Sequence, residues 1–129
     1  MFKYTQAFSG FSVTDLAKAK EFYGQTLGLP VENMGDHGLQ LKLNGTTVFI
    51  YAKDDHQPAT FTVLNFMVDD IDKAVAELKS QGVKFESYEK GRTKTGDDNI
   101  ARSRASGKGP DVAWFKDPFG NFIAVIQPL

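Results

Sequence analysis

This sequence has few nitrogen or sulfur side chains that could bind a metal ion. The chain has two histidines, His37 and His56, and each lies in a turn-like stretch, the second directly after Asp55. A catalytic metal normally needs about three convergent protein ligands, and adjacent residues such as Asp55 and His56 chelate poorly, so we expect both imidazoles to be solvated. The chain has no cysteine, which excludes disulfides, thiolate zinc sites, iron–sulfur clusters and a cysteine nucleophile.

Two further patterns are weak evidence for a phosphate-binding loop or a general base. Gly107-Lys108-Gly109 is similar to a phosphate-binding loop, but a predicted strand follows it, so it lacks the helix amides that such loops use. Glu86 and Glu89 lie on or near a predicted strand, and no nucleophile or oxyanion donor is spaced to pair with either. We expect both glutamates to be solvated.

The elements that position the remaining side chains come from an internal duplication. Residues 11–19 (FSVTDLAKA) and 66–74 (FMVDDIDKA) share five of nine residues at an offset of 55. Each copy predicts a strand, an Asp N-cap, a helix, and a glycine that ends the helix, Gly28 or Gly82. The predicted strands are 6–13, 31–34, 38–43 and 46–52 in the first copy and 61–68, 83–88, 111–116 and 121–127 in the second, and the helices are 16–27 and 71–81.

This pattern is a β-α-β-β-β unit present twice, and neither copy is large enough to bury its own apolar face. A tight turn is expected at Asp117-Pro118-Phe119-Gly120-Asn121, between the last two strands. Residues 90–110 carry six lysines or arginines, two acids and four glycines. They predict a solvated, mobile connection outside the core, and the alternative is a basic lid that would favour an acidic ligand.

Composition limits the classes of partner. The length of 129 residues fits one domain, and 15 basic against 16 acidic residues give a net charge of −1, which argues against nucleic acid. The longest apolar runs are five residues, far below the roughly 18 that would span a membrane. No secretory signal opens the chain, and the lack of cysteine suits a reducing compartment, so we expect a cytoplasmic protein.

Two segments, FSVTDLAKAKEFYGQTLGL and WFKDPFGNFIAVIQ, make the chain resemble the vicinal oxygen chelate superfamily, which comprises glyoxalases, extradiol dioxygenases and bleomycin resistance proteins. The resemblance covers nearly all of residues 6–127. It implies an α+β fold in which two βαβββ repeats, at about 6–52 and 61–127, form paired curved mixed sheets of four strands within one domain, 1–129. It also implies a ligand pocket on the concave side and a homodimer.

Many enzymes of that superfamily hold a divalent metal by side chains from the first and last strand of each unit. The resemblance places these positions at Phe8, Ile50, Val63 and Ala124. A shift of one residue at Ile50 brings Phe49 or Tyr51 to the position, and neither restores a carboxylate. Because divalent ions need oxygen or imidazole donors, we expect no metal and no other cofactor.

Strand alternation predicts which side chains face the cavity. The candidate ligand-binding residues are Phe8, Ser12, Ile50, Val63, Asn65, Met67, Trp114 and Ala124, with Tyr51 or Tyr88 nearby. The opposite faces, which include Phe11, Phe49, Leu64, Phe66, Ile123 and Val125, are expected to pack beneath the helices. Two alternatives stay open at this point: Asn65 satisfies backbone groups at a sheet seam, and Trp114 is a core residue.

We therefore expect a metal-independent protein that binds an apolar or aromatic small molecule, similar to the bleomycin resistance members that sequester a compound without transforming it. One alternative is a lyase- or isomerase-type enzyme of the same superfamily, metal-free or with ligands recruited from loops such as His37 or His56. Another is that the apolar faces form a subunit interface. The sequence leaves open whether the chain is an enzyme.

Overall fold

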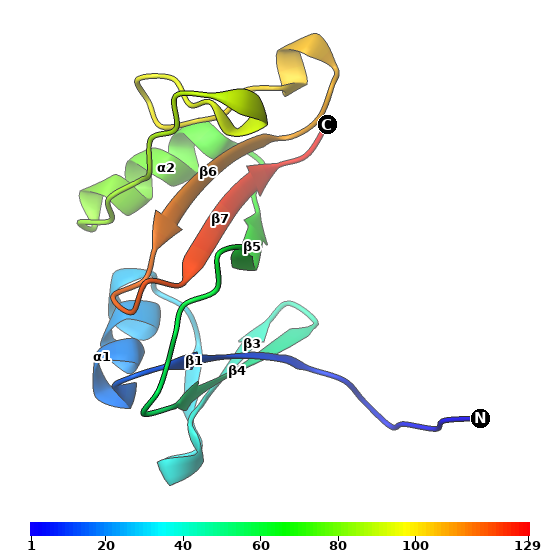
Figure 1. Ribbon diagram of the computed structural model, residues 1–129, viewed down its shortest axis with the longest axis vertical. Helices are drawn as coiled ribbons and strands as arrows, with labels where there is room; N and C mark the ends of the chain where they lie inside the picture. The colour runs from blue at the N-terminus through cyan, green and yellow to red at the C-terminus, as the bar shows by residue number, and fades with distance from the viewer. The chain divides into compact units, whose positions relative to one another are not determined.

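The chain forms two compact units, as the computed structural model of residues 1–129 shows. The N-terminal unit is Met1–Gln57 and the C-terminal unit is Pro58–Leu129, so the boundary falls between the two predicted repeats. Each unit combines a mixed sheet with a helix, which confirms the predicted α+β class (Figure 1). None of the helices is both long enough and apolar enough to span a bilayer.

The N-terminal unit has four strands in the order β1-β4-β3-β2. β1 is parallel to β4, and the other pairs are antiparallel. The elements are β1 (Ser9–Val13), α1 (Leu16–Lys20), a π-helical turn (Glu21–Thr26), β2 (Val31–Asn33), a short 3-10 turn (Gly35–His37), β3 (Leu39–Leu43) and β4 (Thr46–Ala52).

The predicted first helix, 16–27, is not one regular helix. α1 ends at Lys20, and in the π-helical turn that follows the Leu27 N–H donates to the Phe22 carbonyl, five residues back, at 2.9 Å. Tyr23 within that turn is fully buried, and its ring lies 6.0 Å from that of Phe11 on β1. This contact identifies the helix-facing side of the N-terminal sheet.

The C-terminal unit has three strands in the order β5-β7-β6. β5 runs parallel to β7, and β6 runs antiparallel to it. The elements are β5 (Thr62–Met67), α2 (Ile71–Ser80), 3-10 turns at Gly91–Thr93 and Arg104–Ser106, β6 (Asp111–Lys116) and β7 (Phe122–Gln127). α2 packs against β6 and β7 through buried Ile71 and Val75 (Figure 1).

The local signals at the helix ends are confirmed. Asp15 caps α1 by accepting from the Lys18 N–H at 3.1 Å, and Asp70 caps α2 by accepting from the Lys73 N–H at 3.2 Å. Asp117 is buried in the predicted turn between β6 and β7, where its carboxylate accepts from the backbone N–H groups of Phe119 and Asn121, each at 2.9 Å.

The strand predicted at 83–88 is wrong, and with it the fourth strand of the second sheet. Only Phe85 pairs with β6, opposite Phe115. The Glu86 N–H donates to the Trp114 carbonyl at 2.8 Å, and loop side chains bind neighbouring backbone groups: Asn99 donates to the carbonyls of Phe85 and Glu86, and the Thr95 hydroxyl accepts from the Tyr88 N–H at 2.9 Å. These contacts stand in place of a continuous fourth strand beside β6.

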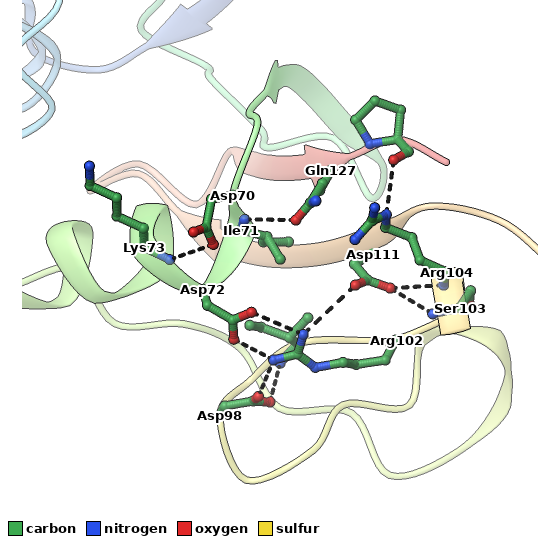
Figure 2. Close-up of polar contacts among 12 residues, drawn as sticks. Asp70, Ile71, Asp72, Lys73, Asp98, Arg102, Ser103, Arg104, Asp111 and Gln127 are labelled. Atoms are coloured by element: carbon green, nitrogen blue, oxygen red, sulfur yellow. Dashed lines mark hydrogen bonds and ion pairs between the residues drawn. The ribbon is translucent and has the colours of Figure 1, made fainter. Parts of the chain in front are cut away.

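The prediction that residues 90–110 lie outside the core is also wrong. Ile100 and Ala101 are buried, and Ala101 forms an antiparallel bridge with Val112 on β6. Figure 2 shows the guanidinium of Arg102 between the carboxylates of Asp72, on α2, and Asp98. Arg102 donates to Asp72 through both terminal nitrogens, at 3.3 and 2.5 Å, and to Asp98 at 2.6 Å.

Asp111 holds the same segment from the sheet side. Its buried carboxylate accepts from the N–H groups of Ser103 and Arg104, at 2.8 and 3.0 Å, and lies 3.8 Å from the Arg102 guanidinium (Figure 2). Hydrogen bonds to Arg102 lower the pKa of Asp72 and of Asp98, and these two bonds raise the pKa of Arg102. The charge of Arg102 is thus matched within the protein by Asp72 and Asp98.

Candidate functional site

The face of the C-terminal sheet turned away from α2 brings several predicted site residues together. Asn65 pairs with Ala124, and Ala124 pairs with Trp114, so the three lie in one row across β5, β7 and β6. Met67 shares this face by alternation and is 74% exposed. The alternation inferred for these residues therefore agrees with the register, while their role in ligand binding stays a prediction.

Trp114 lies across this sheet. Its indole N–H donates to the Thr62 hydroxyl at 3.2 Å. Trp114 is on β6 and Thr62 on β5, and β7 lies between those strands, so the indole spans β7. Ala124 is the β7 residue beside Trp114 and is fully buried. A methyl group at this position leaves room for the ring above it.

Tyr88 supports the indole from the side. The two rings meet edge to face, with centroids 5.6 Å apart and planes inclined at 71°. The backbone of Tyr88 is held through Thr95, so this contact depends on the ordered loop. Partial burial, and secondarily the negative charge of Glu86, raises the pKa of the Tyr88 phenol, which keeps the phenol neutral. Trp114 is thus a half-buried aromatic residue held by contacts with Thr62 and Tyr88.

The placement of Val63 beside these residues is corrected by a bulge. Thr62 pairs with Phe122 and Leu64 with Ile123, so one residue of β5, Val63, has no partner on β7. Thr62 consequently takes the place near the indole that strict alternation assigned to Val63. Sequence analysis missed Thr62 because alternation counts residues in steps of two and a bulge adds one.

In the N-terminal unit, the placement of Ile50 on the ligand face is wrong. Ile50 pairs with Phe11, and paired residues share a face of the sheet. Since Phe11 packs on Tyr23, the fully buried Ile50 lies on the helix side. The face that carries Ser12 instead bears Phe49 and Tyr51, which pair with Gly10 and Ser12.

That outward face has a row of aromatic rings, which we call the N-terminal aromatic row: Phe8, Phe49 and Tyr51. The Phe8 and Phe49 rings are 6.2 Å apart edge to face, and the Phe49 and Tyr51 rings are 6.3 Å apart and nearly parallel. A β-carbon at Gly10 would lie 3.1 Å from the Phe49 carbonyl oxygen, so the row depends on glycine at this position.

His56 lies next to Ser12, which corrects the expectation that it is solvated. The Ser12 hydroxyl and His56 Nδ1 are 2.6 Å apart in a half-buried hydrogen bond. His56 lies in the turn that follows β4. Two backbone hydrogen bonds hold this turn: the Lys53 N–H donates to the Val13 carbonyl at 2.9 Å, and the His56 N–H donates to the Lys53 carbonyl at 3.0 Å. His37 is in the exposed 3-10 turn. No three His, Asp or Glu side chains gather in a way that could hold a metal ion.

Comparison with known proteins gives one match to a family and many to solved structures. Residues 5–125 match the family described as the Glyoxalase/Bleomycin resistance protein/Dioxygenase superfamily. No curated protein matches the chain.

Three solved structures are similar over nearly the whole chain. TnmS3, an antibiotic binding protein from Streptomyces sp. CB03234, is 27% identical, with a TM-score of 0.66 over 99% of this chain and 100% of that one. A superfamily member from Sphaerobacter thermophilus DSM 20745 is 24% identical, with a TM-score of 0.69 over 96% and 98%. A bleomycin-binding protein in complex with bleomycin is 21% identical, with a TM-score of 0.66 over 96% and 98%. The last two show likeness of fold alone.

Proposed function

Because the chain belongs to the glyoxalase/bleomycin resistance protein/dioxygenase superfamily, we propose that it binds an apolar or aromatic small molecule without a metal ion and sequesters it. The observation that carries this proposal is the Trp114 platform, an indole laid across β7 and held by Thr62 and Tyr88. Two proteins of similar structure are named for binding antibiotics, TnmS3 and the bleomycin-binding protein, which favours a ligand of that kind.

The surroundings of the platform suit such a ligand. A planar ring can stack on the outer indole face, and the exposed Met67 adds a polarisable apolar contact on the same side of the sheet. The N-terminal aromatic row offers a second surface of the same chemical kind. Sites for small molecules are typically mostly apolar, with a few polar groups that orient the ligand.

The side chains at the positions of the metal ligands support independence from metal. By the resemblance to metal-dependent relatives these positions are Phe8, Ile50, Val63 and Ala124, and none offers an imidazole or a carboxylate. Phe49 and Tyr51, which lie on the Ser12 face where Ile50 was expected, and Thr62, which takes the place of Val63, offer neither group. Binding must then come from stacking and burial of apolar surface, which need no ion. We further propose that the protein acts in the cytoplasm as a homodimer.

Trp114 is the only tryptophan, so its fluorescence reports on the platform alone. Bleomycin and 2-acetylnaphthalene would each be titrated into protein dialysed against EDTA, and then into the same protein supplied with Zn²⁺, Mn²⁺ or Fe²⁺. We expect saturable quenching by at least one compound, with the same Kd under all conditions.

Two results would contradict the proposal. One is the absence of saturable quenching by either compound. The other is a requirement for metal, seen as binding only after metal is added or as stoichiometric metal retained in elemental analysis of the purified protein.

A further inference from the structure

We propose that Asn65 makes this site selective for aromatic ligands that carry a carboxamide or lactam group. The proposal rests on the proposed function and specifies the ligand class. Asn65 is on β5, the strand that also carries Thr62, the partner of the Trp114 indole. Its side chain is exposed, and its amide is not engaged by another side chain of this unit.

The register places this amide beside the platform. Asn65 and Trp114 flank Ala124, so their backbones are two strand spacings apart, about 10 Å. The indole crosses β7 diagonally to reach Thr62, which pairs with Phe122 and so lies one row along the sheet from Asn65. In the proposed pose, a ring stacked about 3.5 Å above the outer indole face has one edge directed toward Asn65.

The chemistry of Asn65 fits a neutral group that both donates and accepts. The side-chain amide offers a carbonyl acceptor and two N–H donors, so it can form two parallel hydrogen bonds with a carboxamide or lactam. Lys116, which shares this face of β6 with Trp114, is already paired: its Nζ lies 3.6 Å from a Glu86 carboxylate oxygen and 5.0 Å from the centroid of the Phe122 ring. The Lys116 charge is thus matched before any ligand arrives.

Three compounds of nearly equal shape separate the hydrogen-bonding patterns: 2-naphthamide donates and accepts, 2-acetylnaphthalene only accepts, and the cation 2-naphthamidine only donates. Binding would be measured by isothermal titration calorimetry at pH 7. We expect the wild-type protein to bind 2-naphthamide about tenfold more tightly than 2-acetylnaphthalene, the effect of one net hydrogen bond.

The variant Asn65→Asp replaces the donors by a second acceptor and adds a negative charge. It should reverse the preference, so that 2-naphthamidine binds more tightly than 2-naphthamide. Asn44→Asp is the matched control, because Asn44 is an exposed asparagine on the turn between β3 and β4, and it should keep the wild-type order.

The outcomes separate the two proposals. If all three compounds bind the wild-type protein equally, or if Asn65→Asp keeps the wild-type order, the role of Asn65 is refuted and ligand binding itself stands. If 2-acetylnaphthalene binds and 2-naphthamide does not, selection for carboxamides is likewise refuted. If none of the three binds the wild-type protein, the role of Asn65 is refuted, and the titration with bleomycin then decides whether the proposed function stands.

Discussion

Ala124 shows how the size of one side chain controls this site. The Trp114 indole can reach Thr62 only by crossing β7, and Ala124 is the β7 residue in its row. A larger side chain there would occupy the volume that the ring needs.

Replacing Ala124 by leucine tests this dependence. The added methyl groups should displace the indole and lower the free energy of unfolding by about 1–3 kcal/mol, the usual cost of overpacking. The Trp114 emission maximum should shift to longer wavelength, and quenching by 2-acetylnaphthalene should be lost. Ala76→Leu, on the exposed side of α2, is the control and should change neither. An unchanged emission spectrum in Ala124→Leu would show that the indole does not need the space.

At the scale of elements, the segment 90–110, which is not part of the sheet, makes contacts that help to position the Trp114 ring. Arg102 joins Asp72 on α2 to Asp98 within the segment, and Asp111 fixes the backbone at Ser103. The same segment holds Tyr88 through Thr95, and Tyr88 contacts the Trp114 ring. A cluster of charges far from the indole thus helps to position it.

The Arg102 cluster predicts how order in this segment depends on pH. Arg102 lowers the pKa of Asp72 and Asp98 below the ordinary value of 3.8. The resulting stabilisation is complete above pH 3.8 and is lost as the pH falls through the lower folded-state values. In Arg102→Gln, protection of the Ala101 amide from hydrogen exchange should fall at pH 6 by a modest factor, because the ion pairs are largely exposed.

The control for this prediction is Lys42→Gln, which removes the exposed pair with Glu32 in the other unit and should leave Ala101 protection unchanged. Wild-type protection should approach that of Arg102→Gln as the pH falls through the lowered pKa values of Asp72 and Asp98. Equal protection of the Ala101 amide in the wild-type protein and in Arg102→Gln at pH 6 would show that the Arg102 cluster does not order this segment.

At the scale of the whole molecule, the N-terminal residues present apolar surface that their own unit does not cover. Phe2 is 85% exposed and Tyr4 71%, and their rings stack on each other at 5.7 Å. Phe8 follows at 67%. Exposed aromatic residues so close together are typical of an interaction surface, which is consistent with the proposed homodimer.

The double variant Phe2→Ser/Tyr4→Ser tests whether these exposed N-terminal aromatic residues form part of the homodimer interface. Sedimentation equilibrium at micromolar concentration should give twice the 14.3 kDa chain mass for the wild-type protein and a lower average mass for the variant. Leu129→Ser removes a comparably exposed side chain at the other terminus and should not change the mass. A wild-type protein that sediments as a monomer contradicts the homodimer.

Features that depend on neighbours along the chain could be predicted from the sequence. The caps Asp15 and Asp70, the left-handed Gly28 and Gly82 and the turn at Asp117 each use a local geometry that one or two residue types favour. Alternation within a strand is also local, so Asn65 and Met67 could be assigned to one face. The lack of cysteine and the scarcity of histidine required no structure at all.

What the tertiary structure decided were relations between distant segments. Whether Ile50 or Phe49 shares a face with Ser12 depends on the register between β1 and β4, and the place of Thr62 depends on a bulge. The bond between Ser12 and His56 joins residues 44 positions apart. The hydrogen bonds of Thr95 and Asn99 to the backbone of residues 85–88, and the burial of Ile100, likewise require residues 90–110 to fold back onto their own unit. A one-residue slip changes every such contact without altering the local pattern, so only the packed structure could resolve them.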